Sequence, residues 1–128
     1  MKIMILIEYF TDASYSPQQK ISVIGFKIRG CNTINTEKLI GINSTQSEIL
    51  GIQRCVDHFA NNYNIETHKY YIYTDCQRGL NLPIIGKIIK IDGHKPSRLK
   101  SKNDLEFSKV DKYVRKELRR FVRSKSCS

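Results

Sequence analysis

Four acidic residues in this sequence are placed where their carboxylates can meet. Asp12 and Asp75 each follow a threonine at the end of an apolar, strand-like run. A strand that ends in aspartate brings a carboxylate to the edge of its sheet, and two adjacent strands bring two. Glu48 lies at the start of one amphipathic stretch and Asp111 near the start of another. The four side chains are therefore candidates for one shared site.

A gathering of acids in a basic protein predicts a divalent metal site. A carboxylate that points toward a sheet must be paired or bound to metal, because burying it alone costs too much free energy. Carboxylate and water oxygens suit Mg²⁺, with Mn²⁺ as a possible substitute. Two such ions activate the attacking water and stabilise the leaving oxygen in a phosphodiester displacement. We therefore expect two Mg²⁺ ions per site.

Each acid also has an ordinary structural interpretation. Asp12 alone fits a turn aspartate bonded to its own backbone, and Asp75 fits an N-cap for the short segment after it. Glu48 closes the sequence Thr-Gln-Ser-Glu at 45–48, which has the form of a capping box. Asp111 fits a first-turn acid that the helix dipole favours. The four occurring together favour the shared site.

The charge of the chain predicts an anionic partner. The sequence has 22 Lys and Arg against 12 Asp and Glu, a net charge of +10, and such an excess is typical of nucleic-acid-binding proteins. From Lys95 to the end there are 12 basic and 4 acidic residues, so most of the net charge lies in the last quarter. A basic surface around a carboxylate site predicts a nucleic-acid substrate, whereas the tail alone also fits a solvated helix face.

Length and cysteine content predict a single domain in a reducing compartment. The 128 residues fit one domain, 1–128, with one core. The four cysteines contain no C-x-x-C pair, so reduced thiols are expected. The apolar run 3–7 is too short for a signal peptide, and no stretch is long enough to span a membrane. We expect a cytoplasmic monomer without membrane association.

Hydrophobic periodicity predicts an α/β fold with a five-stranded mixed sheet and two main helices. The first three strands, joined by short turns, are expected to form an antiparallel meander. The strand after the first helix is expected to be parallel to a neighbour. Two further segments are a short connection at 77–86 and a basic loop at 94–103. The expected elements are strands at 3–11, 21–29 and 38–43, a helix at 45–61, strands at 70–74 and 87–91, and a helix at 104–122.

The acids and elements, taken in order, resemble the ribonuclease H family in its type 1 and retroelement-like branch. The family places Asp on the first strand, Glu on the first helix, Asp at the end of the fourth strand and Asp in the last helix. The spacings here, 36, 27 and 36 residues, keep that order, and the resemblance covers nearly the whole chain. It rests on Thr11-Asp12-Ala13-Ser14, Thr45-Gln46-Ser47-Glu48, Thr74-Asp75-Cys76-Gln77, and Gly93-His94 followed by 110–115.

The resemblance implies a ribonuclease H-like fold and an endonuclease that hydrolyses the RNA strand of RNA/DNA hybrids with two metal ions. Cleavage by such an endonuclease would leave 5′-phosphate and 3′-hydroxyl ends. By position, Asp12 would bridge the two metals, and Glu48 and Asp75 would complete the leaving-group side. Asp111 would hold the metal that carries the nucleophilic water. His94 matches a mobile-loop histidine near the scissile phosphate, with an ordinary surface histidine as the alternative.

The resemblance also predicts how a hybrid would be held. Polar residues Asn43, Ser44, Thr45 and Gln77 fall where the family contacts the minor groove, which displays the RNA 2′-hydroxyls. Only 19 residues separate Asp75 from His94, so the middle helices and basic protrusion of the family are nearly absent. We hypothesise that a basic loop and helix replace them, through Lys95, Arg98, Lys100, Lys102, Arg115, Lys116, Arg119 and Arg120.

Other functions remain open on the same residues. The first is another nuclease of this fold, a junction resolvase or an exonuclease. The exonuclease branch has Asp-x-Glu on the first strand, whereas Asp12 precedes Ala13 and Ser14. A resolvase would dimerise and prefer branched DNA. The second is a catalytically silent nucleic-acid-binding module, against which the four intact acids argue. The length fits a stand-alone enzyme as well as a piece of a larger replication protein.

Overall fold

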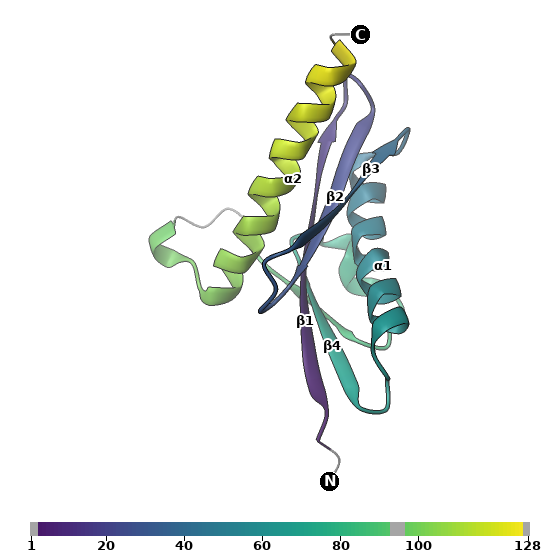
Figure 1. Cartoon of the computed structure of the whole chain (residues 1–128), viewed down its shortest axis with the longest axis vertical. Coiled ribbons are helices and arrows are strands. Elements are labelled where there is room, and N and C mark those ends of the chain that lie inside the picture. The colour runs from purple at the N-terminus through teal and green to yellow at the C-terminus, as the bar shows by residue number, and fades with distance from the viewer. Residues whose placement is uncertain (1–2, 93–96, 127–128) are drawn as a thin grey trace.

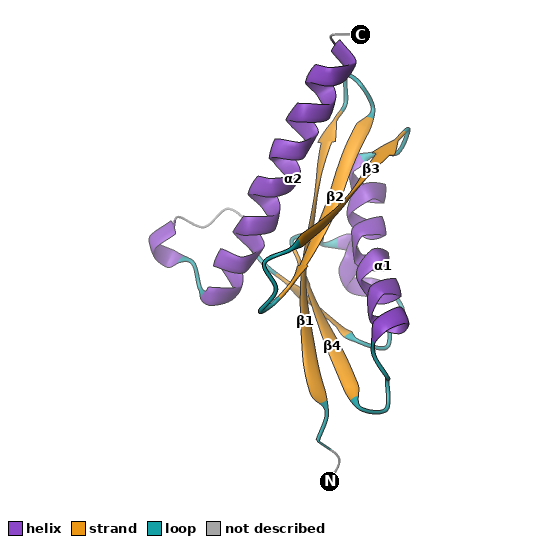
Figure 2. Ribbon diagram, viewed as in Figure 1, coloured by secondary structure: helices purple, strands orange, loops and turns teal. Residues whose placement is uncertain are grey.

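A five-stranded mixed sheet with one long helix on each face forms the computed structural model of residues 3–92 and 97–126 (Figures 1 and 2). The expected α/β class, with five strands and two main helices, is confirmed. Among the described residues, no helix combines the length and apolar character needed to cross a membrane. The elements are β1 (Ile5–Ser16), β2 (Ile21–Ile28), β3 (Ile34–Ile40), α1 (Ser44–Asn62), β4 (His68–Thr74), β5 (Lys87–Lys90) and α2 (Lys102–Ser126), with 3-10 helices at Arg78–Asn81 and Ser97–Leu99.

The strand order is β3-β2-β1-β4-β5, with β1 at the centre. β1, β2 and β3 pair in antiparallel fashion, as the meander prediction required. β4 pairs parallel to β1 after the α1 crossover, and β5 pairs parallel to β4. The central position of β1 agrees with its continuous apolar sequence, because both faces of the sheet are covered by helices.

Several element boundaries differ from the prediction. β1 continues to Ser16, well past the expected end at residue 11. β3 spans 34–40 instead of 38–43, because its polar, largely exposed edge residues carry little apolar periodicity. α2 begins at 102 instead of 104. Its cap is Ser101, which accepts a hydrogen bond from the backbone N–H of Asp104 and donates one to the Asp104 carboxylate.

Two hydrophobic clusters lie on opposite faces of the sheet. Successive strand residues point to opposite faces, so the neighbours Tyr9 and Phe10 belong to different clusters. The α1 face also contains Ile52, Cys55, Phe59 and Ile72. The α2 face also contains Val23, Tyr73, Phe107, Val110 and Val114.

Glycines allow both helices to approach the centre of the sheet closely. A Cβ atom on Gly25 of β2 would lie 2.6 Å from Cγ1 of Val114 on α2. A Cβ atom on Gly51 of α1 would lie 2.8 Å from the Thr11 hydroxyl oxygen. Gly25 is paired in register with Asp12. Both helices therefore approach the sheet closely beside that aspartate.

Gly25→Ala is expected to destabilise the protein by about 1–3 kcal/mol, because the added methyl overpacks the contact with Val114. Urea unfolding measures this loss. The Gly25→Ala/Val114→Ala double variant should be less destabilised than the sum of the single variants by about 1 kcal/mol, because the smaller partner makes room for the methyl. Strictly additive losses would show that the two residues do not compete for space.

Candidate metal centre

Three carboxylates from separate elements meet at one edge of the sheet. Asp12 lies in β1, Glu48 in α1, and Asp75 directly after β4, and each has an oxygen atom within 4.8 Å of the others. The parallel register pairs Phe10 with Tyr73, so two residues further on Asp12 comes level with Asp75. β1 continues beyond the end of β4. Asp12 is therefore a residue of a continuing strand, and its interpretation as a turn aspartate is wrong.

The chain turns sharply after β4 and places Asp75 at the site. The Thr74 hydroxyl accepts a hydrogen bond of 3.1 Å from the backbone N–H of Cys76, and the Thr74 carbonyl accepts one of 2.8 Å from Ile91. The N-cap of the following 3-10 helix is Gln77, which forms no side-chain cap bond. Asp75 is therefore not the cap that its sequence context also allowed.

Glu48 is not part of the capping box of α1. The N-cap is Asn43, whose side chain accepts from the backbone N–H of Gln46 at 2.8 Å, while the Gln46 side chain accepts from the Asn43 N–H at 3.0 Å. The capping box predicted over 45–48 is wrong. The Glu48 carboxylate instead accepts a hydrogen bond from the Cys76 thiol. Burial and the neighbouring Asp75 raise the pKa of Glu48, and the bond from Cys76 opposes that rise.

Asp111 reaches the site from the opposite face of the sheet. It lies nine residues after the first residue of α2, so its interpretation as a first-turn acid is wrong. Its carboxylate shares a hydrogen bond with Asp12, and its Oδ1 lies 3.0 Å from Nε of Arg115. The group that meets within 4.8 Å consists of Asp12, Glu48 and Asp75. Asp111 adds a fourth carboxylate on the Asp12 side.

The pKa of Asp12 is strongly raised in the folded protein. Its side chain is buried, with the residue 6% exposed. Burial, the hydrogen bond with Asp111 and the negative charge of Asp75 raise the pKa of Asp12 to about 9. Two carboxyl groups that share a hydrogen bond need a proton between them. A divalent cation can take the place of that proton, and an all-oxygen donor set suits Mg²⁺ or Mn²⁺.

No protein-family model matches this sequence, and no curated protein matches it. A functional assignment therefore depends on the fold and on the chemistry of this carboxylate cluster.

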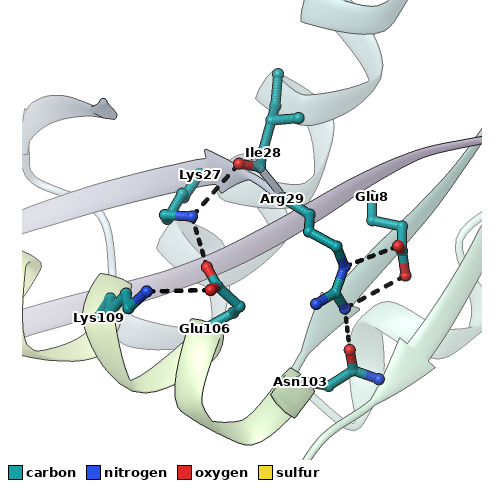
Figure 3. Close-up of polar contacts among 7 residues, drawn as sticks. All are labelled: Glu8, Lys27, Ile28, Arg29, Asn103, Glu106 and Lys109. Carbon is teal, nitrogen blue, oxygen red and sulfur yellow. Dashed lines mark hydrogen bonds and ion pairs between the residues drawn. The ribbon is translucent and has the colours of Figure 1, made fainter. Parts of the chain in front are cut away.

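Ion pairs fix the first half of α2 against the sheet (Figure 3). The buried Lys27 ammonium of β2 donates to Glu106 at 2.5 Å. Arg29, directly after β2, donates to Glu8 of β1 at 2.8 Å and also to Asn103. Breaking a buried pair on one side is costly, because it leaves an uncompensated charge. These contacts hold α2 in the position where Asp111 reaches Asp12 of β1.

The predicted minor-groove residues surround the N-terminus of α1 and the turn after β4. Ser44 and Gln77 are exposed and Thr45 is half-buried. Asn43 is exposed, but its side chain caps α1. Asn43, Ser44 and Thr45 thus lie three to five residues before Glu48 at the start of α1, and Gln77 lies two residues after Asp75.

The basic residues predicted to hold the substrate lie mainly on α2 and the turn before it. Arg98, Lys102, Arg115, Lys116, Arg119 and Arg120 are exposed. Lys100 is half-buried and donates to the Ser108 hydroxyl at 2.6 Å. Arg120 pairs with Glu117. His94 and Lys95 lie outside the described residues.

Sequence reasoning missed several residues that shape the site. The glycines at 25 and 51 carried a usable signal, because a glycine inside a strand or helix often marks a close backbone approach. Ser101 and Asp104 carried one too, since they form the S-x-x-D pattern of a capping box. Cys76 gave no such signal, because only the fold brings its thiol to Glu48.

Proposed function

We propose that this protein is a ribonuclease H, a metal-dependent endonuclease that hydrolyses the RNA strand of RNA/DNA hybrids with two Mg²⁺ ions. Mn²⁺ would be a substitute. The proposal rests on the convergence of Asp12, Glu48 and Asp75, with Asp111 hydrogen-bonded to Asp12. Four segments far apart in the sequence deliver these acids to one place. The mixed sheet with a central β1 agrees with the resemblance that suggested this function.

The four carboxylates fit a pair of divalent ions. When bound, such ions lower the pKa of water and stabilise the charge that develops on the leaving oxygen. Asp12 is the residue common to both parts of the site, because it belongs to the cluster with Glu48 and Asp75 and also bonds to Asp111. The hydrogen bond from Cys76 orients the Glu48 carboxylate. Arg115 holds Asp111 from the outer side.

The surroundings of the site suit a nucleic acid that contains RNA. The net charge of +10 favours association with a polyanion. Ser44, Thr45 and Gln77 present hydroxyl and amide groups beside the acids, and such groups can hydrogen-bond to 2′-hydroxyls across a wide minor groove. These contacts would distinguish the RNA strand from DNA.

A labelled RNA/DNA hybrid, assayed beside RNA/RNA, DNA/DNA and branched DNA, tests the proposal. We expect Mg²⁺ or Mn²⁺ to support cleavage of the RNA strand of the hybrid, and EDTA to stop it. Cleavage confined to branched DNA would identify a resolvase instead. Hybrid binding without cleavage at any Mg²⁺ or Mn²⁺ concentration would identify a catalytically silent binding module.

A further inference from the structure

A groove separates the second half of α2 from the β1–β2 hairpin. Figure 1 shows these two segments side by side, reaching the same end of the molecule. The hairpin contributes residues 15–18 to the groove, and α2 contributes Arg119, Val122 and Arg123, around a volume of about 380 Å³. The groove follows the carboxylate cluster along both segments, because Tyr15 lies three residues after Asp12 and Arg119 lies eight residues after Asp111.

Three arginines form a single row along this side of α2. Arg115, Arg119 and Arg123 are four residues apart, so they lie on one helix face, separated by about 6 Å along the axis. Arg115 pairs with Asp111 at 3.0 Å. Arg119 and Arg123 are exposed and form no ion pair among the described residues. Two uncompensated positive charges therefore line the groove.

An ordinary solvated helix face does not explain this row. Exposed helix faces are usually stabilised by opposite charges four residues apart, and like charges at that spacing destabilise the helix. Arg119 has an arginine four residues away on each side. The nearest acid of this half of α2, Glu117, pairs instead with Arg120. The arrangement favours an anionic ligand that lies along the row.

We propose that this arginine groove, formed by Arg119, Arg123 and residues 15–18 with Arg115 one turn before it on the same helix face, binds the phosphodiester backbone of the nucleic acid on one side of the cleavage site. The inference rests on the proposed function, because the carboxylate cluster fixes where the strand is cut. The regular spacing suits successive phosphates of one strand. Guanidinium groups bind phosphate through paired hydrogen bonds. The half-buried Tyr15 adds an aromatic side chain to the lining of the groove.

We place the arginine groove in the role of the family's basic protrusion, which is nearly absent from this chain. Much of the positive charge lies in the last quarter of the chain. Part of it belongs to the row of arginines on α2, whose first member, Arg115, lies one helical turn after Asp111. A substrate that extends along this line meets arginines that a short duplex ending at the cleavage site cannot reach. Affinity should therefore depend on duplex length on one side of the scissile bond only.

Binding of a fluorescent RNA/DNA hybrid in EDTA, where no cleavage is expected, tests the proposal. Arg119→Gln/Arg123→Gln keeps the helix propensity and should weaken binding about tenfold near physiological salt. The slope of log affinity against log salt should become shallower by about 0.9 for each phosphate that the variant no longer neutralises. The matched control is Lys69→Gln/Lys87→Gln, which removes the same charge from exposed positions at the starts of β4 and β5 and should change binding little.

The outcomes separate this inference from the proposed function. If the arginine variant and the control bind like the wild type, or lose affinity equally, the arginine groove is not a backbone site, whether or not the wild type cleaves. If only the arginine variant loses affinity and salt dependence while the wild type fails to cleave in Mg²⁺, the arginine groove stands and the nuclease assignment fails. Arg119→Lys/Arg123→Lys keeps the charge but loses the paired hydrogen bonds, so it should keep the salt dependence of the wild type with an affinity between the wild type and the glutamine variant. A salt dependence as shallow as that of the glutamine variant would contradict a phosphate-binding role.

Discussion

Asp12→Asn is expected to abolish cleavage of the RNA strand and, in the absence of divalent ions, to raise the melting temperature. Asn keeps the size of the side chain but removes the negative charge that a metal needs, so activity should fall by at least about 10²–10³-fold. The stabilisation follows from burial. Asp12 is 6% exposed, beside Asp75 and Asp111, with a pKa raised to about 9. Near pH 8 the folded protein must therefore take up a proton there that the unfolded chain does not hold, and a neutral amide avoids this cost.

The two halves of this result distinguish a metal site from a structural carboxylate. Cleavage is measured on a labelled hybrid in Mg²⁺, and stability by thermal unfolding in EDTA. Asp57→Asn is the matched control, because Asp57 is an exposed aspartate of α1 whose side chain is 63% accessible. It should leave both quantities unchanged. A stable Asp12→Asn protein with wild-type cleavage would refute the site. A less stable variant in EDTA would show that the Asp12 carboxylate serves the fold.

The two aspartates of the strands could be predicted from the sequence, because each follows a threonine at the end of an apolar run. An apolar run that ends in Thr-Asp indicates where a carboxylate leaves the core, and this held for Asp75, which directly follows β4. The same pattern misplaced Asp12 relative to its strand, because β1 continues for four residues beyond it. Those residues pair with β2 and have no neighbour in β4. The hydrophobic periodicity of a strand does not show where its neighbouring strand ends, so the extra length of β1 could not be predicted from its own sequence.

The caps and close contacts were less accessible for a different reason. Asn43, Ser44 and Thr45 are all good N-caps, and the choice of Asn43 depends on the path of the chain from Gly41, whose φ is +86°. That choice decides whether Glu48 serves the helix end or the site. The approach of α2 to Gly25 likewise depends on packing between elements far apart in sequence. Local patterns thus identified the chemical groups, and tertiary contacts determined which of them meet.

The stability of the protein without divalent ions is expected to fall as pH rises, through the contribution of Asp12. The pKa of the folded residue is raised to about 9 from its ordinary value of 3.8. The folded state therefore holds more protons than the unfolded state between these values, and stability decreases with pH across that window. The contribution is fully present below about pH 4. Above about pH 9 no further loss is expected.

Divalent ions should reverse this trend, because Mg²⁺ or Mn²⁺ competes with the proton for the same oxygens. The rise in melting temperature that either ion causes should be small near pH 5 and largest near pH 9, since ligand binding to the folded state alone stabilises it. Thermal unfolding in EDTA, Mg²⁺ and Mn²⁺ measures both effects. Comparison with Asp12→Asn isolates them from other titrating groups such as Glu8, where burial acts to raise the pKa but hydrogen bonds from Tyr73 and Arg29 lower it overall. A wild-type melting temperature that neither ion changes at pH 8 would contradict the metal centre, because four carboxylates that include the buried Asp12 should be stabilised by a bound cation.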